Sequence, residues 1–205
     1  MKRCVIVGSA AINNYIKVKQ YLKDDDYFVY CDGGLKHMDE LGFKPDLIVG
    51  DFDSHDNPNL NVETIVLPCV KDDTDTAHAL KVCIERGYTD FLFIGCIGER
   101  IDHTFGNVAL LIMLKEKDLK GTMIDDYSEM SIVSKEESID DSFTYFSLIT
   151  LSDSADGITI KNAKYPLENG SIKSGFQYGV SNEVNKGRTA TVSCKSGNLL
   201  LIKVF

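Results

Sequence analysis

Acidic residues that could do chemistry are concentrated in two short runs of the sequence. Residues 50–54 read Gly-Asp-Phe-Asp-Ser, and residues 71–75 read Lys-Asp-Asp-Thr-Asp. If the fold brings the runs together, several carboxylates share one small volume, and two such charges about 4 Å apart repel by roughly 4 kcal/mol at an effective dielectric constant of about 20. That arrangement persists only if a cation neutralises it or if the pKa of a carboxyl group rises. Oxygen ligands at this density suit Mg²⁺, and Mg²⁺ in turn suits a nucleotide polyphosphate.

Two further polar segments have the residue types of a phosphate site. Residues 32–34 read Asp-Gly-Gly, and residues 95–98 read Gly-Cys-Ile-Gly, followed by Arg100 and by Asp-His at 102–103. Backbone amides of a glycine-rich loop, together with an arginine, can hold phosphate oxygens. The glycine segment by itself is a weak signal, because it matches neither the Walker A loop nor the GxGxxG pattern.

The elements that must position these groups alternate along the first two-thirds of the chain. Hydrophobic periodicity predicts strands at residues 3–8, 27–31, 47–49, 64–67 and 91–94. It predicts helices at residues 14–22, from about 34 to 41, and at 74–86 and 103–115. Such alternation indicates a mostly parallel sheet covered by helices on both faces. Every polar segment above follows a predicted strand, so all of them would meet at the edge where ligands bind in such sheets.

The pattern changes after about residue 120, beyond which no convincing helical stripe occurs. Strands are predicted at residues 143–151, 158–161, 188–194 and 199–204. Ser-Gly-Asn at 196–198 makes a hairpin between the last two strands an expectation. We therefore predict an α/β protein whose N-terminal sheet is mostly parallel and flanked by helices, followed by a C-terminal antiparallel β-sandwich, with the boundary after residue 125.

Composition and charge exclude several classes of function. The 205 residues are 43% apolar and 26% charged, as in an ordinary globular protein, and the formal charge of −9 argues against a nucleic-acid partner. No run is long and apolar enough for a bilayer span, and the first apolar run is read as a strand and not as a signal peptide. The six cysteines form no CxxC pair or zinc-site spacing, so we expect reduced core thiols in a cytoplasmic protein that is not bound to a membrane.

Each motif also has a purely structural interpretation. The polar residues of 50–54 could be turn and cap residues, those of 72–75 could cap a helix, and 32–34 could be a simple turn. Four chemically matched groups at successive strand ends are much harder to explain in this way. Of the histidines, His37, His55 and His78 are interpreted as surface or structural residues, whereas His103 belongs to the glycine-loop segment.

Taken together, the motifs resemble those of the thiamine pyrophosphokinase family. The resemblance is carried by residues 45–54 (PDLIVGDFDS), by 68–75 with its KDDTD run, and by 95–103 (GCIGERIDH) with Asn107. It extends to residues 164–169 and 180–183. It implies an α/β nucleotide-binding catalytic domain at residues 1–125, a β-sandwich thiamine-binding domain at 126–205, and a homodimer with active sites at the interface. The implied reaction converts ATP and thiamine into AMP and thiamine diphosphate.

The same resemblance implies roles for individual residues. The acidic cluster that binds Mg²⁺ and the triphosphate of ATP would comprise Asp51, Asp53, Asp72 and Asp75, and Asp102 would lie near the metal or the thiamine hydroxyl. Contacts to the nucleotide are expected from Asp32, Gly33, Lys71, Gly95, Gly98, Arg100, His103 and Asn107. Contacts on the thiamine side are expected from Ser181 and Asn182. Some family members have a tryptophan near thiamine, and Tyr165 could stack in its place because this chain has none.

Three points stay open at this level. An aspartate could accept the proton of the thiamine hydroxyl, and Asp102 and Asp72 are the leading options. The acidic cluster alone would also permit a Mg²⁺-dependent nucleotide phosphohydrolase. A non-catalytic sensor of thiamine or nucleotide is the third reading.

Overall fold

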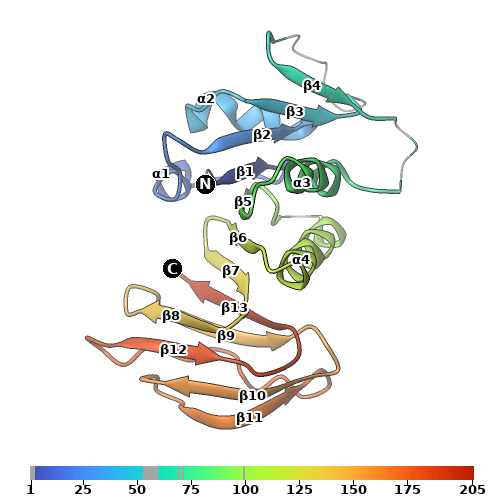
Figure 1. The fold of residues 1–205 in the computed structure, drawn as a ribbon. Helices are drawn as coiled ribbons and strands as arrows, with labels where there is room; N and C mark the ends of the chain where they lie inside the picture. The colour runs from blue at the N-terminus through green and yellow to red at the C-terminus, as the bar shows by residue number, and fades with distance from the viewer. Residues whose placement is uncertain (1–2, 53–59, 69, 71, 99) are drawn as a thin grey trace. The chain divides into compact units, whose positions relative to one another are not determined.

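The computed structural model describes residues 3–52, 60–68, 70, 72–98 and 100–205 (Figure 1). The chain divides into two compact units, Met1–Asp126 and Tyr127–Phe205. The elements of the first unit are β1 (Cys4–Val7), α1 (Tyr15–Lys19), β2 (Tyr27–Cys31), the 3₁₀ helix η1 (Asp32–His37), α2 (Met38–Leu41), β3 (Leu47–Gly50), β4 (Glu63–Val66), α3 (Asp75–Glu85), β5 (Asp90–Ile94), α4 (Ile101–Glu116) and β6 (Lys120–Ile124).

The strands of the first unit form a parallel sheet in the order β4-β3-β2-β1-β5-β6. Every residue of β1 and of β3 is buried, and so are four of the five residues of β2 and of β5. Strands that are apolar on both faces need cover on both faces, because either exposed face would leave apolar surface in water. The predicted parallel sheet is confirmed.

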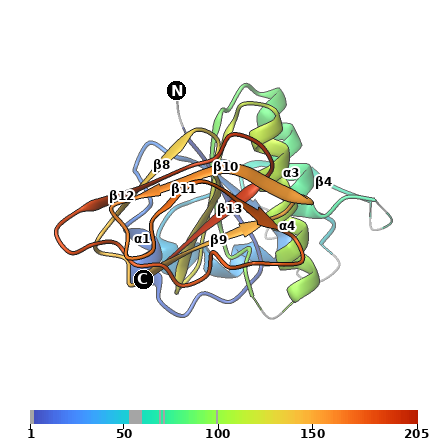
Figure 2. The same cartoon turned by 90° about the horizontal axis from the view of Figure 1, so that it is seen from below.

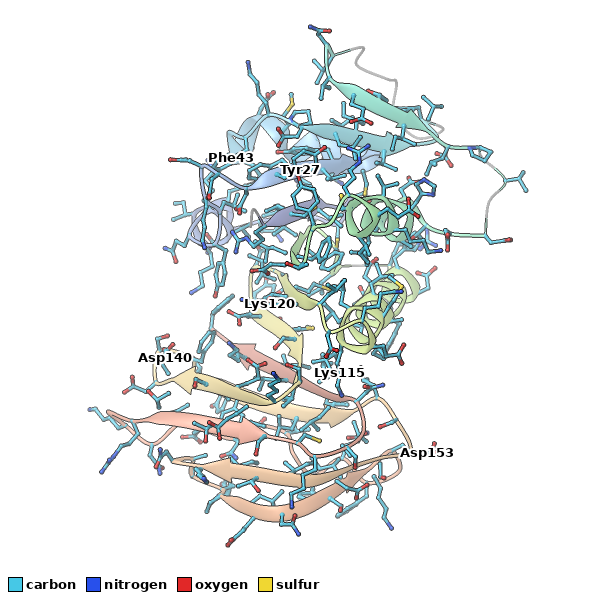
Figure 3. All side chains as sticks on the ribbon, viewed as in Figure 1. Tyr27, Phe43, Lys115, Lys120, Asp140 and Asp153 are labelled. Atoms are coloured by element: carbon cyan, nitrogen blue, oxygen red, sulfur yellow. The ribbon has the colours of Figure 1, made fainter. Side chains whose placement is uncertain are left out.

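Helices supply that cover from two sides. Val5 and Val7 of β1 share an apolar cluster with Val18 of α1 and Leu41 of α2. Cys4, which alternates with them along the strand, interacts with Cys83 on α3. At the rim of the first cluster Phe43 stacks on Phe28, with ring centroids 4.5 Å apart; Figure 3 labels Phe43.

The helix starts follow from capping chemistry. The Thr74 hydroxyl accepts a hydrogen bond from the amide of Ala77 and so begins α3, and Asn14 does the same for Lys17 in α1. One prediction was wrong in kind: the segment from about residue 34 to Leu41, predicted as one helix, is not a single α-helix. It begins as the 3₁₀ helix η1 and becomes α-helical only at Met38.

The second unit contains only strands as regular elements. They are β7 (Ser128–Ile132), β8 (Glu136–Asp140), β9 (Tyr145–Thr150), β10 (Ser154–Lys161), β11 (Leu167–Lys173), β12 (Thr189–Ser193) and β13 (Leu199–Val204). One antiparallel layer has the order β7-β13-β9, and the other has the order β11-β10-β12-β8. The layers are visible in Figures 1 and 2, and side chains from both form one apolar cluster. The predicted antiparallel sandwich is confirmed.

The expected hairpin between the last two strands was wrong. β12 pairs with β8 and β10, whereas β13 pairs with β7 and β9, so the turn at 196–198 carries the chain from one layer to the other. The strands β6, β7, β8 and β11 were not predicted. Their sequences are polar or glycine-containing, and β11 is irregularly paired beside Asn169, whose φ is +49°.

The described cysteines are free thiols, and Cys4, Cys31, Cys83 and Cys96 are buried. They behave as small apolar side chains in the core, as the sequence indicated. Among the described residues, none of the helices has the length and apolarity that a membrane crossing needs.

The Thr74 cap gives a first prediction, because Asp75 directly follows it. We expect Thr74→Ala to lower the free energy of unfolding by about 1 kcal/mol, since one amide of α3 loses its acceptor. Thr74→Ser keeps the hydroxyl and should stay near the wild-type value. Urea denaturation measures both variants, and equal losses in the two would refute the capping role.

Candidate active site

Three carboxylates converge at the carboxyl edge of the parallel sheet. One carboxylate oxygen from each of Asp32, Asp51 and Asp75 lies within 4.8 Å of the others. Asp32 is buried, and Asp51 and Asp75 are half-buried. The oxygens Asp32 Oδ1 and Asp75 Oδ1 are both shielded from solvent. This acidic cluster brings together residues that are 19 and 24 positions apart in the chain.

The ends of regular elements determine the position of each aspartate in the acidic cluster. Asp32 follows β2, Asp51 follows β3, and Asp75 begins α3. Gly50 permits the close approach, because a Cβ on it would lie 2.5 Å from the Cβ of Asp32. Phe52 has φ +55°, a left-handed conformation that is uncommon for an aromatic residue and that turns the chain sharply after Asp51.

A cavity of about 240 Å³ lies at the ends of β1 and β5. Its walls are the segment 8–11, which follows β1, and the segment 95–98, which follows β5. The residues that line it are Gly8, Ser9, Ala10, Ala11, Lys36, Thr76, Gly95, Cys96, Gly98, Arg100, His103, Thr104 and Asn107. Five of these, Gly95, Gly98, Arg100, His103 and Asn107, are candidates from the sequence.

The two wall segments are in direct contact. The amide of Gly8 donates to the Ile94 carbonyl at 2.8 Å, and the amide of Ala10 donates to the Gly95 carbonyl at 2.8 Å. A Cβ on Gly95 would lie 2.6 Å from the Gly8 oxygen, and the φ of Gly95 is +62°. Only glycine meets both conditions without strain.

Helix α4 fixes the second wall from behind. The buried Asn107 side chain donates to the Cys96 carbonyl at 2.8 Å. The hydroxyl of Thr104 accepts from the Gly98 amide at 3.1 Å. The segment 95–98 is therefore held at two points by side chains of the helix that follows it.

The acidic cluster and the cavity share structural elements. Thr76 lines the cavity and directly follows Asp75, and its hydroxyl accepts from the Cys31 thiol at 3.9 Å. Lys36 lines the cavity from η1, the helix that Asp32 begins. The residue that follows Asp75 and the helix that Asp32 begins therefore both contribute to the cavity lining.

Arg100 and Asp102 form a bidentate pair at the cavity rim. Arg100 Nε and Nη2 donate to the two Asp102 oxygens at 2.9 and 2.6 Å. This pairing holds the pKa of the Asp102 carboxyl well below its usual range and raises the pKa of Arg100. A carboxylate held in this way is a weak base, and Asp102 is not a member of the acidic cluster.

The remaining candidates of the first unit divide into two groups. Asp53 and Lys71 lie outside the described residues. Asp72 is exposed and does not belong to the acidic cluster, whereas Asp32, assigned to the nucleotide from the sequence, does belong to it. Gly33 lies in η1 between Asp32 and Lys36 but does not line the cavity.

Sequence reasoning missed several residues that line the cavity: Gly8, Ser9, Ala10, Ala11, Lys36, Thr76 and Thr104. The glycine that ends the first strand was a usable signal for segment 8–11, because it has the same place as the predicted polar segments. Lys36 carried a weaker signal, a cation four positions after Asp32.

The thiamine-side candidates lie in the second unit. Asn182 is buried. Its Oδ1 accepts a hydrogen bond from the Tyr165 amide at 3.0 Å, and its Nδ2 donates to the Tyr165 carbonyl at 2.8 Å. Asn182 therefore joins two segments that are 17 residues apart. Ser181 is exposed with φ +60°, and its amide donates to the Ser147 hydroxyl at 3.0 Å. Tyr165 is 60% exposed, and the Lys164 Nζ lies over its ring, 5.6 Å from the centroid.

Comparison with known proteins identifies the family. Residues 18–123 match the family model described as the catalytic domain of thiamin pyrophosphokinase, and residues 129–199 match its vitamin B1 binding domain. Thiamine pyrophosphokinase of Bacillus subtilis (strain 168) is 28% identical over 212 residues, which covers 99% of each chain. The two units of this chain therefore correspond to the two domains of an enzyme, a catalytic domain and a vitamin-binding domain. The chain belongs to the thiamine pyrophosphokinase family.

Solved structures agree with this assignment. The crystal structure of thiamine pyrophosphokinase from Bacillus subtilis superimposes with a TM-score of 0.87 at 26% identity, covering 99% of each chain. The enzyme from Geobacillus thermodenitrificans gives a TM-score of 0.85 at 27% identity, covering 99% of this chain and 97% of the other.

The contact between the cavity walls gives a second prediction. We expect Gly95→Ala to lower the free energy of unfolding by about 2 kcal/mol, because the new methyl group meets the Gly8 carbonyl in a left-handed conformation. Gly106→Ala is the matched control: it lies within α4 with open space around it, and it should raise stability by about 1 kcal/mol. Equal effects in the two variants, measured by urea denaturation, would contradict the close packing of the walls.

Proposed function

We propose that this protein transfers the pyrophosphoryl group of ATP to the hydroxyl of thiamine, giving thiamine diphosphate and AMP. The observation that carries the proposal is the convergence of Asp32, Asp51 and Asp75 beside a polar cavity in a member of this family. The family assignment supports the substrates, and the site supports Mg²⁺ as the ion that accompanies ATP.

The acidic cluster fits Mg²⁺ by the chemistry of its donors. Among the residues that the structure describes, the cluster consists of carboxylates, whose oxygens suit hard divalent cations better than transition metals. Asp32, Asp51 and Asp75 would hold the ion, and from the sequence Asp53 and Asp72 would add to the acidic surroundings. When bound, Mg²⁺ neutralises phosphate oxygens and draws negative charge from the phosphorus under attack.

The cavity is assigned to the nucleotide. Its small residues at 8–11 and 95–98 permit close approach of phosphate or ribose oxygens. Lys36 and Arg100 supply positive charge, and His103 and Asn107 border the same space. From the sequence, Gly33 and Lys71 also belong to the nucleotide side of the proposal.

The chemical step is a displacement at the β-phosphorus of ATP. The thiamine oxygen forms a bond to that phosphorus, the bond between it and the bridging oxygen to the α-phosphorus breaks, and AMP leaves with that oxygen. The hydroxyl proton must be accepted during the step. Asp102 and Asp72 are the two candidates for accepting it, and Asp102 is paired with Arg100.

The thiamine-side assignment rests on the second unit. Tyr165 would stack on a thiamine ring through its exposed face, and Ser181 would offer a hydroxyl and a peptide group in an unusual backbone conformation. Asn182 would act by holding Tyr165 in place. We place the nucleotide-binding catalytic domain at residues 1–125, the thiamine-binding domain at 126–205, and the enzyme in the cytoplasm.

We further propose a homodimer with active sites at the interface. Helix α4 supports this, because Ile101 and Phe105, one turn apart, expose 59% and 68% of their surface. Apolar side chains aligned on a helix face are typical of a surface that is covered in the assembly.

Carboxylate neutralisation tests the metal assignment. We expect Asp32→Asn and Asp75→Asn each to lower Mg²⁺-dependent AMP formation by about 10²-fold or more, because each removes charge from the ion's ligands. Asp73→Asn is the matched control: Asp73 pairs with Lys81 outside the acidic cluster, and its variant should retain near-normal turnover. A coupled assay for AMP measures all three.

The same assay separates the proposed transfer from its alternatives. AMP formation that requires thiamine supports transfer. Phosphate release in the absence of thiamine would identify a hydrolase, and ligand binding without turnover would identify a sensor. Near-normal activity of both cluster variants would defeat the metal assignment.

The dimer has its own test. We expect Phe105→Glu to shift the protein from dimer to monomer in sedimentation velocity, because it places a charge in the covered apolar face. Ile16→Glu, at an equally exposed apolar residue of α1, should leave the dimer intact. A monomeric wild-type protein, or dissociation in both variants, would reject this face as the interface.

A further inference from the structure

A buried histidine supports the first wall of the cavity from behind. His37 is the last residue of η1 and is only 2% exposed, although its neighbour Lys36 lines the cavity. Its Nε2 lies 2.9 Å from the Ala10 carbonyl oxygen, and its Nδ1 lies 2.7 Å from the Tyr15 hydroxyl. Ala10 belongs to segment 8–11, so the ring connects a cavity wall to helix α1.

The Ala10 carbonyl fixes the tautomer of the neutral ring. A carbonyl can only accept, so Nε2 must carry hydrogen and donate to Ala10. A neutral imidazole has one N–H, so Nδ1 accepts from the Tyr15 hydroxyl. The Tyr15 hydroxyl thereby holds the ring in the orientation that supports the wall.

Tyr15 is itself held in place. Asp126 accepts hydrogen bonds from the backbone amides of Asn13 and Asn14, each at 2.8 Å, directly before Tyr15. A chain of contacts thus runs from Asp126 through the start of α1 to Tyr15, His37 and the Ala10 carbonyl. Every link after Asp126 is uncharged.

The surroundings of the ring favour its neutral form. Burial lowers the pKa of His37 below its ordinary value of 6.5 and Lys36 adds to this, while the Ala10 carbonyl acts in the opposite direction. Glu40 and Asp126 are the charged groups that act on Tyr15. Since the folded state disfavours protonation, its stability is full above the unfolded pKa and is lost as the pH falls through the folded pKa.

We propose that His37, oriented by Tyr15, is a positioning residue for nucleotide binding: its Nε2–H holds the Ala10 carbonyl and so sets the cavity wall at segment 8–11. The inference rests on the proposed function, because it takes the cavity to be the ATP site. It assigns His37 no contact with substrate. The expected signature is a change in ATP affinity with the turnover of the saturated enzyme preserved.

Four variants test the proposal in the full-length protein. His37→Leu removes the donor, His37→Gln keeps an amide N–H of similar reach, and Tyr15→Phe removes only the hydroxyl that orients the ring. Tyr30→Phe is the matched control, because it deletes another buried hydroxyl of the first unit, one that donates to the Phe43 carbonyl at 2.7 Å. Calorimetric titration with ATP and Mg²⁺ gives Kd, and the AMP assay gives kcat and KM.

We expect His37→Leu to raise Kd and KM for ATP about tenfold, with kcat within about twofold of wild type, as the loss of one buried hydrogen bond to a ligand-binding segment predicts. Tyr15→Phe should raise Kd about threefold. His37→Gln should restore Kd to within about threefold of wild type, and Tyr30→Phe should leave it unchanged even if stability falls.

Acidity supplies a readout that a general loss of stability would not reproduce. Between pH 7.5 and 5.5 the wild-type protein should lose more ATP affinity than His37→Gln, because only the wild-type ring can gain a proton at Nδ1, which removes the acceptor of the Tyr15 hydroxyl and places a charge in the buried contact. His103 and the phosphates of ATP titrate in both proteins, so the ratio of the two Kd values removes their contribution.

Several results would overturn the inference. These are an unchanged Kd in His37→Leu, equal weakening by His37→Gln and His37→Leu, a Tyr30→Phe effect as large as that of Tyr15→Phe, or a pH-independent ratio. If His37→Leu does not fold, an unchanged Kd in Tyr15→Phe is decisive against it. Wild-type protein that binds no ATP would instead reject the proposed function and this inference with it.

Discussion

The mutual repulsion of three carboxylates is the constraint on which the rest of the site depends. At separations within 4.8 Å, each charged pair of Asp32, Asp51 and Asp75 repels by about 3.5 kcal/mol at an effective dielectric constant of about 20. A small domain is stable by only about 5–15 kcal/mol, so such a cluster needs a rigid frame and a counter-charge. The frame is the buried parallel sheet. The counter-charge, in the proposed function, arrives with the nucleotide.

The frame works because none of the three aspartates depends on a flexible side chain for its position. Asp32 and Asp51 directly follow neighbouring strands whose residues are buried, and Asp75 begins a helix that Thr74 caps. Gly50 has no Cβ, and a Cβ there would clash with Asp32 at the neighbouring ends of β2 and β3. Binding of a divalent ion therefore requires little rearrangement of backbone, which is how a folded protein recovers the cost of assembling like charges.

The sequence predicted the strands of the parallel sheet and the polar residues at their ends. It could do so because buried parallel strands are continuous apolar runs, and polar residues that end such runs stand out. It predicted Asp51 and Asp75 together for that reason. It did not show that Asp32 belongs with them, since that depends on the spacing of β2 and β3 and on the bare Cα of Gly50. The hairpin expected at 196–198 failed because a turn signal does not reveal whether the chain stays in one layer.

Residues that act through backbone carbonyls are the hardest to find in a sequence, and the cavity walls depend on them. His37, Tyr15, Asn107 and Thr104 all hold the walls through uncharged hydrogen bonds, and only Asn107 belonged to a motif seen in the sequence. Uncharged supports suit a cavity that is to bind an anion. If a carboxylate replaced the His37 imidazole, it could not donate to the Ala10 carbonyl when ionised. It would also add negative charge beside the phosphates. Among the described residues that line the cavity none is a carboxylate, and the cationic ones are Lys36 and Arg100, of which Arg100 is paired with Asp102.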